Sequence, residues 1–203
     1  MTIFDVGSTV IFFGDSITDA GRREDPDRLG SGYVRLLAGK LDGRTVINSG
    51  IGGNRAVDLQ AQLDDDVLAH RPDLVSIMIG INDTWRRFDR NEPTSTEAYE
   101  ESYRDVLRRI TDAGARAILL EPFVLPVTEE QATAWREDLV PRIEVVHRLG
   151  ADFDAPVVPL DVELNKLAAE RGSAELAADG VHPTDRGHAE IARLWLNSAT
   201  AQE

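Results

Sequence analysis

The chain of 203 residues has no cysteine, few aromatic residues and no long apolar run. Without cysteine it can form no disulfide, use no cysteine nucleophile and hold no zinc through thiolates. No apolar run approaches the roughly 18 residues that cross a bilayer, so we expect no transmembrane segment. The segment Met1–Gly7 lacks a basic start followed by an apolar core, so we expect no signal peptide and a cytoplasmic location.

Basic residues are also scarce, with 22 Lys and Arg against 36 Asp and Glu, which gives a formal net charge of −14. Such a surface repels nucleic-acid phosphates and anionic lipids, so we expect neither nucleic acid nor a membrane among the partners. A neutral small molecule suits this charge. The length fits a single domain over residues 1–203 with a substantial core.

Short apolar runs alternate with longer amphipathic stretches, the pattern of an α/β fold. Strands are predicted at Val10–Phe13, Thr45–Asn48, Leu74–Ile79, Ala115–Leu120 and Val157–Leu160. The third run is apolar almost throughout, as in a central strand covered on both faces. We therefore predict a three-layer α/β/α sandwich around a five-stranded parallel sheet.

The stretches between the strands predict helices. These are Tyr33–Leu41, Ala56–Ala69, Thr94 to about Ala113, Thr128–Leu149 and a last helix after Thr184. The run Thr94–Glu97 has the form of a capping box, and Thr184 is placed to cap the last helix. Pro141 can interrupt the fourth helix because proline lacks the backbone N–H.

Polar residues follow several strands at the edge where ligands bind in parallel sheets. Ser16 follows the first strand, Gly50–Asn54 the second and Gly80–Asp83 the third, while Asp179–His182 follows the last strand–helix unit. A serine that attacks a carbonyl carbon needs a base to take its proton and a carboxylate to orient that base. Ser16, His182 and Asp179 can supply these groups, although each also fits an ordinary turn.

Attack on a carbonyl also requires hydrogen-bond donors for the developing oxyanion. The backbone N–H of Gly52 and the side-chain amide of Asn82 are candidate donors, although a glycine loop and an Asn are each common in turns. Their joint occurrence after successive strands favours a serine esterase.

Four blocks in this order resemble the SGNH (GDSL-type) hydrolases: Gly14–Asp19, Asn48–Asn54, Gly80–Asp83 and Asp179–Pro183. The resemblance implies a flavodoxin-like α/β/α fold. It implies that Ser16 is the nucleophile and that Ser16, Gly52 and Asn82 form the oxyanion hole. It further implies that His182 is the base and that Asp179 holds it.

Two longer strings, Leu29–Val34 and Val75–Arg86, resemble the branch that contains intracellular acetylxylan esterases. This implies removal of acetyl groups from xylo-oligosaccharides or similar sugars, and a homo-oligomer. The string Ser49–Gly53 departs from the pattern, since it carries an extra glycine where related proteins often have serine. Side chains that can contact the ester substrate, or can instead serve packing, are Asp15, Tyr33, Arg55, Trp85, Arg86 and Arg87.

We expect no metal and no organic cofactor. Arg55 stands where a dinucleotide-binding loop needs its third glycine, and there is no phosphate-binding loop motif. Asp64–Asp66 fits a solvated helix face, and the remaining histidines lack metal-ligand spacing.

Three alternatives remain. The same residues could serve a thioesterase or lysophospholipase on long acyl chains, although no apolar cap insertion is evident, or a broad arylesterase. A catalytically inactive carbohydrate-binding module on the same fold is a further alternative, which the intact Ser16, Asn82, Asp179 and His182 disfavour.

Overall fold

The structure is a computed structural model that describes residues 9–200. Five strands form one parallel sheet in the order β2-β1-β3-β4-β5. The strands are β1 (Thr9–Gly14), β2 (Thr45–Gly50), β3 (Leu74–Met78), β4 (Arg116–Leu120) and β5 (Val157–Val158). This confirms the predicted parallel sheet, whose strand order is that of flavodoxin-like folds.

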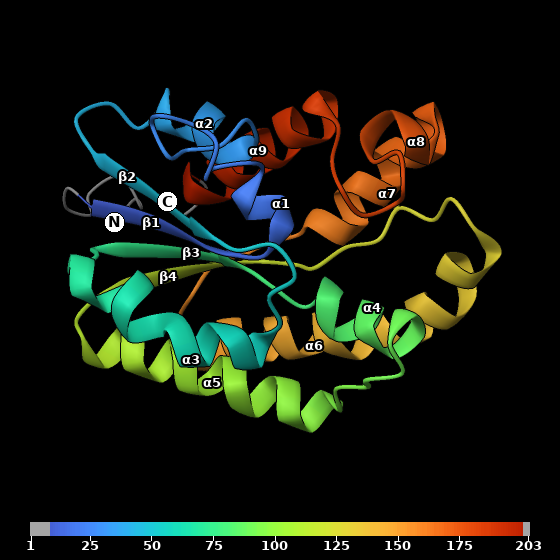
Figure 1. Cartoon of the computed structure of the whole chain (residues 1–203), viewed down its shortest axis with the longest axis horizontal. Helices are drawn as coiled ribbons and strands as arrows, with labels where there is room; N and C mark the ends of the chain where they lie inside the picture. The colour runs from blue at the N-terminus through green and yellow to red at the C-terminus, as the bar shows by residue number, and fades with distance from the viewer. Residues whose placement is uncertain (1–8, 201–203) are drawn as a thin grey trace.

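Helices cover both faces of the sheet, which confirms the predicted three layers (Figure 1). One face carries α2 (Tyr33–Ala38), α7 (Leu160–Arg171), α8 (Ser173–Leu176) and α9 (Asp185–Thr200). The other carries α3 (Ala56–Asp66), α5 (Thr96–Asp112) and α6 (Arg136–Asp152). Shorter elements are α1 (Ser16–Asp19), η2 (Leu68–His70), α4 (Ile81–Asp89) and the π-helical turn η3 (Gln131–Trp135).

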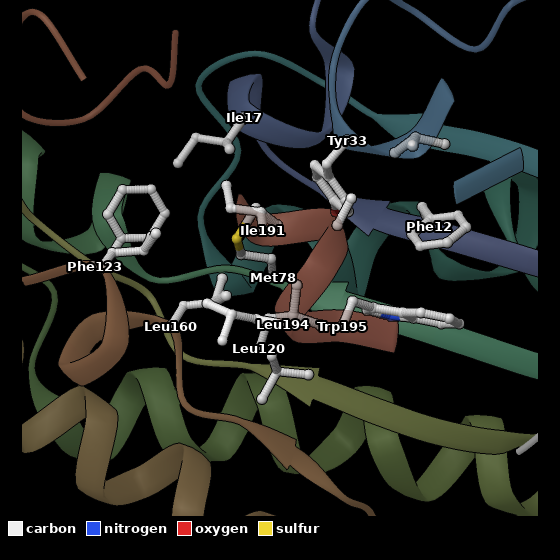
Figure 2. Packing of buried hydrophobic residues seen from close by; sticks show 14 of the residues in the cluster. Phe12, Ile17, Tyr33, Met78, Leu120, Phe123, Leu160, Ile191, Leu194 and Trp195 are labelled. Atoms are coloured by element: carbon white, nitrogen blue, oxygen red, sulfur yellow. The ribbon is translucent and has the colours of Figure 1, made fainter. Parts of the chain in front are cut away.

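Successive side chains of each strand point to opposite faces and so build two separate cores. On one face Phe12 packs against Tyr33 and Trp195, with ring centroids 5.8 and 5.7 Å away (Figure 2). The indole N–H of Trp195 donates to Ser76 Oγ on β3 at 3.0 Å. Phe13, the residue after Phe12, belongs to the other core, under α3 and α5. Packing on both faces fixes the strand ends, from which the site is built.

Several details differ from the sequence predictions, and helices α4, α7 and α8 form in stretches where the sequence analysis names no helix. The fifth strand stops at Val158, because Pro159 cannot donate to the ladder, and Leu160 begins α7. The cap of α5 is Ser95, which accepts from Ala98 N, so the capping box at Thr94 is wrong.

The fourth predicted helix runs through Pro141 to Asp152 without interruption. Proline there removes one backbone hydrogen bond, and the carbonyl that loses it belongs to the exposed Glu137. Finally, Asn82 lies in the first turn of α4 rather than in a loop. The predicted cap of α9 is confirmed, since Thr184 Oγ1 accepts from Gly187 N at 3.2 Å.

Candidate active site

Ser16 is presented where β1 turns into α1. The strand ends at Gly14, and Asp15 caps the short helix by accepting from Ile17 N at 3.0 Å. The serine is therefore the first helical residue, and its own N–H belongs to the helix N-terminus, where backbone donors lack intrahelical partners. This position suits both a nucleophilic hydroxyl and a donor to an oxyanion.

The structure brings Ser16, His182 and Asp179 together. Ser16 Oγ lies 3.0 Å from His182 Nε2, and His182 Nδ1 lies 2.6 Å from Asp179 Oδ2. Roughly half of each of the two latter side chains is exposed, so a substrate can reach them. The imidazole can therefore take a proton from the hydroxyl while the carboxylate fixes its orientation.

The loop that carries Asp179 and His182 is held by contacts the sequence did not reveal. Gln131 in η3 donates from Nε2 to Asp179 O at 2.8 Å, and Leu125 N donates to Gly180 O at 2.8 Å. Gly180 has a φ of 86°, and a Cβ there would lie 2.8 Å from Leu125 O. Only glycine fits this turn, which places the carboxylate three residues before the imidazole it contacts.

The Asp179 carboxylate also binds backbone donors, because its Oδ1 accepts from Val181 N at 2.9 Å and from His182 N at 2.7 Å. Partial burial works to raise the pKa of Asp179. The hydrogen bonds from the His182 ring and from these two N–H groups outweigh it, and the pKa lies below its ordinary value. The group is therefore a carboxylate at neutral pH.

Both candidate oxyanion donors lie beside Ser16. A Cβ on Gly52 would be 3.7 Å from Ser16 Cβ, and the Gly52 N–H donates to Asp19 Oδ2 at 3.3 Å. Asn82 donates one amide hydrogen from Nδ2 to Asn54 O at 3.0 Å. Among residues 9–200 its second amide hydrogen has no partner, so it can bind a ligand.

Asp83 links the segments that carry these two donors. The sequence analysis does not predict this role. The side chain is fully buried, and Oδ2 accepts from Ala56 N at the start of α3, at 3.2 Å. Burial raises the pKa of Asp83 to about 7, against the opposing effects of the Ala56 N–H and the charge of Arg142. This contact fixes the loop before α3, which carries Gly52, to the segment that carries Asn82.

A cavity of about 190 Å³ opens beside the nucleophile. It is lined by Ser16, Gly53, Asn82, Trp85, Arg86, Asp89 and His182. The Trp85 ring contacts the His182 ring, with ring centroids 5.7 Å apart. It also contacts the Trp135 ring, with centroids 5.4 Å apart. The structure thus places Trp85 and Arg86 where a substrate would bind.

The other expected contact residues lie elsewhere. Asp15 and Tyr33 are both fully buried, Asp15 as the cap of α1 and Tyr33 with its hydroxyl 2.9 Å from Thr18 Oγ1, which favours the packing role that the sequence left open for both. Arg55 is the N-cap residue just before α3, lies 3.6 Å from Asp58 and is outside the cavity lining. Arg87 points away, to Asp138 at 3.0 Å, and lines a separate cavity of about 390 Å³.

Burial of Asp15 makes the stability of the protein depend on pH. Desolvation raises its pKa from 3.8 to about 7, against the lowering effects of the Ile17 N–H and the His182 charge. The folded protein keeps this carboxyl neutral up to about pH 7, whereas the unfolded chain ionises it above about pH 4. Its contribution to stability is therefore full at low pH and is lost as the pH rises from 4 through 7.

Asp15→Asn should remove this loss and keep the cap, because Asn also accepts at a helix N-cap. Relative to the wild type, we expect its free energy of unfolding to gain about 3 kcal/mol between pH 4 and pH 8. Urea unfolding of both proteins at these pH values measures the gain. The exposed Asp42→Asn serves as the control, and an equally large gain there would contradict the assignment to Asp15.

Over residues 9–200, no three His, Asp or Glu side chains are arranged to hold a metal ion. In the same part of the chain no helix is both long enough and apolar enough to span a bilayer.

A serine, an imidazole and a carboxylate in this arrangement at the carboxyl edge of a parallel sheet define a serine hydrolase. Comparison with known proteins makes this specific. The sequence profile of the GDSL-like lipase/acylhydrolase family matches residues 12–190, and the chain belongs to this family.

The similar proteins include a sequence and a crystal structure from one organism and a sequence from another. An acetylxylan esterase from Geobacillus stearothermophilus is 34% identical, over 94% of this chain and 93% of the relative. The crystal structure of the acetylxylan esterase Axe2 from that organism has a TM-score of 0.87 and 32% identity, over 96% of this chain and 94% of the other. Thioesterase 1/protease 1/lysophospholipase L1 from Escherichia coli K12 is 26% identical, over 86% of this chain and 75% of the relative.

Proposed function

We propose that this chain removes O-acetyl groups from carbohydrates, such as acetylated xylo-oligosaccharides or similar sugars, through an acyl-enzyme on Ser16. The observation that carries the proposal is the continuous contact from Ser16 Oγ through His182 to Asp179, at 3.0 and 2.6 Å. The likeness to an acetylxylan esterase over almost the whole chain supports the choice of substrate.

In the first step His182 Nε2 takes the proton of the Ser16 hydroxyl as Oγ bonds to the carbonyl carbon of the ester. The carbonyl π electrons move to its oxygen, which the Ser16 N–H, the Gly52 N–H and the Asn82 amide stabilise. In the free enzyme the Gly52 N–H is bound to Asp19, so it must turn from that carboxylate to the oxyanion. Asp179 stabilises the imidazolium that forms.

The tetrahedral intermediate then collapses. The carbon–oxygen bond to the sugar breaks, and His182 gives its proton to the departing sugar oxygen, which leaves as a hydroxyl. An acetyl group remains on Ser16 Oγ. Water, deprotonated by His182, attacks this ester in the same way and releases acetate, and the proton returns to Oγ.

The cavity suits a polar sugar ester better than a substrate with a long hydrocarbon chain. Its volume of about 190 Å³ is small, and two of its lining residues, Arg86 and Asp89, are charged. A long acyl chain would bury these charges against methylene groups, which costs desolvation energy. The net charge of −14 further suits an uncharged sugar ester.

A second candidate is a thioesterase or lysophospholipase that uses the same residues on longer chains, which the likeness to the Escherichia coli protein supports. A broad arylesterase that acts on small esters is a further alternative. Membership of a hydrolase family sets the inactive binding module aside. A homo-oligomeric state, a cytoplasmic location and organisation as a single domain stay predictions.

Hydrolysis of p-nitrophenyl acetate, butyrate and octanoate beside peracetylated xylobiose separates these candidates. We expect turnover selective for acetate that includes the sugar ester. Preference for octanoate, with the sugar ester untouched, would contradict the carbohydrate substrate and favour the long-chain hydrolase. Activity on the aryl acetate alone would favour the arylesterase.

A further inference from the structure

One wall of the cavity comes from a single segment of α4. Trp85, Arg86 and Asp89 all line it, and Arg86 Nη1 donates to Asp89 Oδ2 at 2.9 Å. The two side chains of this ion pair are 16% and 33% exposed. They are therefore fixed against each other while still facing solvent beside the nucleophile.

This ion pair leaves polar atoms unused. Among residues 9–200, neither Arg86 Nη2 nor Asp89 Oδ1 has a hydrogen-bond partner. A guanidinium donor held next to a carboxylate acceptor suits two neighbouring hydroxyl groups, because each hydroxyl can both donate and accept. An acyl chain offers neither group. The wall is therefore built for a polyol rather than for hydrocarbon.

Gly53 leaves room for the guanidinium group of Arg86. Its φ is 88°, and a Cβ there would lie 3.2 Å from Arg86 Nη2, closer than ordinary packing allows. A larger residue at this position would strain the backbone and press against the end of the Arg86 side chain. The backbone conformation at Gly53 is thus coupled to the position of Arg86 in this chain.

The wall lies on the His182 side of the catalytic centre, and this position indicates which half of the ester the wall contacts. His182 delivers a proton to the departing oxygen, so the alcohol half of the ester lies next to the imidazole. Trp85 is the aromatic ring of this wall, 5.7 Å from the His182 ring. Indole rings bind the apolar faces of ligands that also carry polar groups.

We infer that Trp85, Arg86 and Asp89 form a subsite for the sugar ring of the alcohol half. Arg86 Nη2 and Asp89 Oδ1 bind two vicinal hydroxyls next to the acetylated position, and the Trp85 ring covers the C–H face of the sugar. This inference rests on the proposed function, and it adds that the enzyme recognises free hydroxyls beside the acetyl group.

The test compares three acetates that share the acyl group. Methyl 2-O-acetyl-β-xylopyranoside has two free vicinal hydroxyls, the fully acetylated methyl xyloside has none, and p-nitrophenyl acetate has no sugar. Arg86→Met and Asp89→Ala each remove one of the proposed contacts. Arg87→Met is the matched control, because Arg87 is the neighbouring arginine of α4 and points to Asp138, outside the cavity.

We expect kcat/KM for the mono-acetylated xyloside to fall at least about tenfold more than kcat/KM for p-nitrophenyl acetate in both variants, mainly through KM. The fully acetylated xyloside should lose less than the mono-acetylated one, because it has no hydroxyl to lose. Arg87→Met should leave all ratios at the wild-type value. Thermal melts of each variant show that the fold is retained.

Other outcomes overturn the inference in distinguishable ways. If the wild type cleaves the xyloside and the Arg86 and Asp89 variants cleave it with an unchanged ratio, the subsite is wrong and the proposed function stands. If the variants instead gain activity on p-nitrophenyl octanoate, the wall limits the acyl group and does not bind the sugar. If the wild type cleaves p-nitrophenyl acetate alone, the proposed function falls and the subsite with it.

Discussion

Ser16→Ala should lower kcat/KM for acetyl esters by about 10⁵–10⁶-fold, because the variant has no oxygen to form the acyl-enzyme. The residual rate would come from the oxyanion donors acting on a water molecule. Ser16 starts a helix and is only partly buried, and alanine is a good helix former. The fold and its melting temperature should therefore stay close to those of the wild type.

Mass spectrometry after treatment with a serine-directed fluorophosphonate checks the same prediction without a substrate. The wild type should gain one phosphonyl group on Ser16, and Ser16→Ala should gain none. The exposed Ser31, whose hydroxyl donates to Ala20 O, gives a control variant in Ser31→Ala that should label and turn over normally. Labelling of the Ser16 variant, or loss of label in the control, would refute the assignment of the nucleophile.

The sheet could be predicted because its determinants are local in the sequence. The runs that became β1 and β3 are apolar, and each is fully covered by helices on both faces. Asp179 and His182 could be paired because the two residues lie three apart around a glycine. Ser16, Gly52 and Asn82 each follow a strand, so a parallel sheet necessarily brings them to one edge.

What could not be predicted depends on contacts between distant segments. Tyr33 carries a polar hydroxyl, but this hydroxyl is hydrogen-bonded to Thr18, which is also buried. The tyrosine can therefore lie in the interior. Asp83 is bonded to the start of α3, and Gln131 to the loop of Asp179, across 27 and 48 positions of the chain. Trp85, Arg86 and Asp89 lie together because the segment from Ile81 is helical, and the sequence did not predict that helix.

Asn82→Ala should lower kcat by about 10²–10³-fold, equivalent to about 3–4 kcal/mol of barrier, with a much smaller effect on KM. The amide bonds weakly to a neutral carbonyl oxygen and strongly to the oxyanion, so its loss is felt mainly in the transition state. Asn82→Asp is a comparison variant of the same shape, because it replaces the amide donor by a carboxylate that repels the oxyanion. We therefore expect Asp to be no better than Ala at this position.

Asn82 also donates to Asn54 O, and removing that bond could loosen the loop that carries Gly52. Two readouts separate such a structural effect from lost transition-state stabilisation. A loosened loop would lower the melting temperature and raise KM, whereas a lost oxyanion donor lowers kcat in a protein that melts like the wild type. A kcat within threefold of wild type in Asn82→Ala would remove Asn82 from the oxyanion hole and leave Ser16 and Gly52 as its donors.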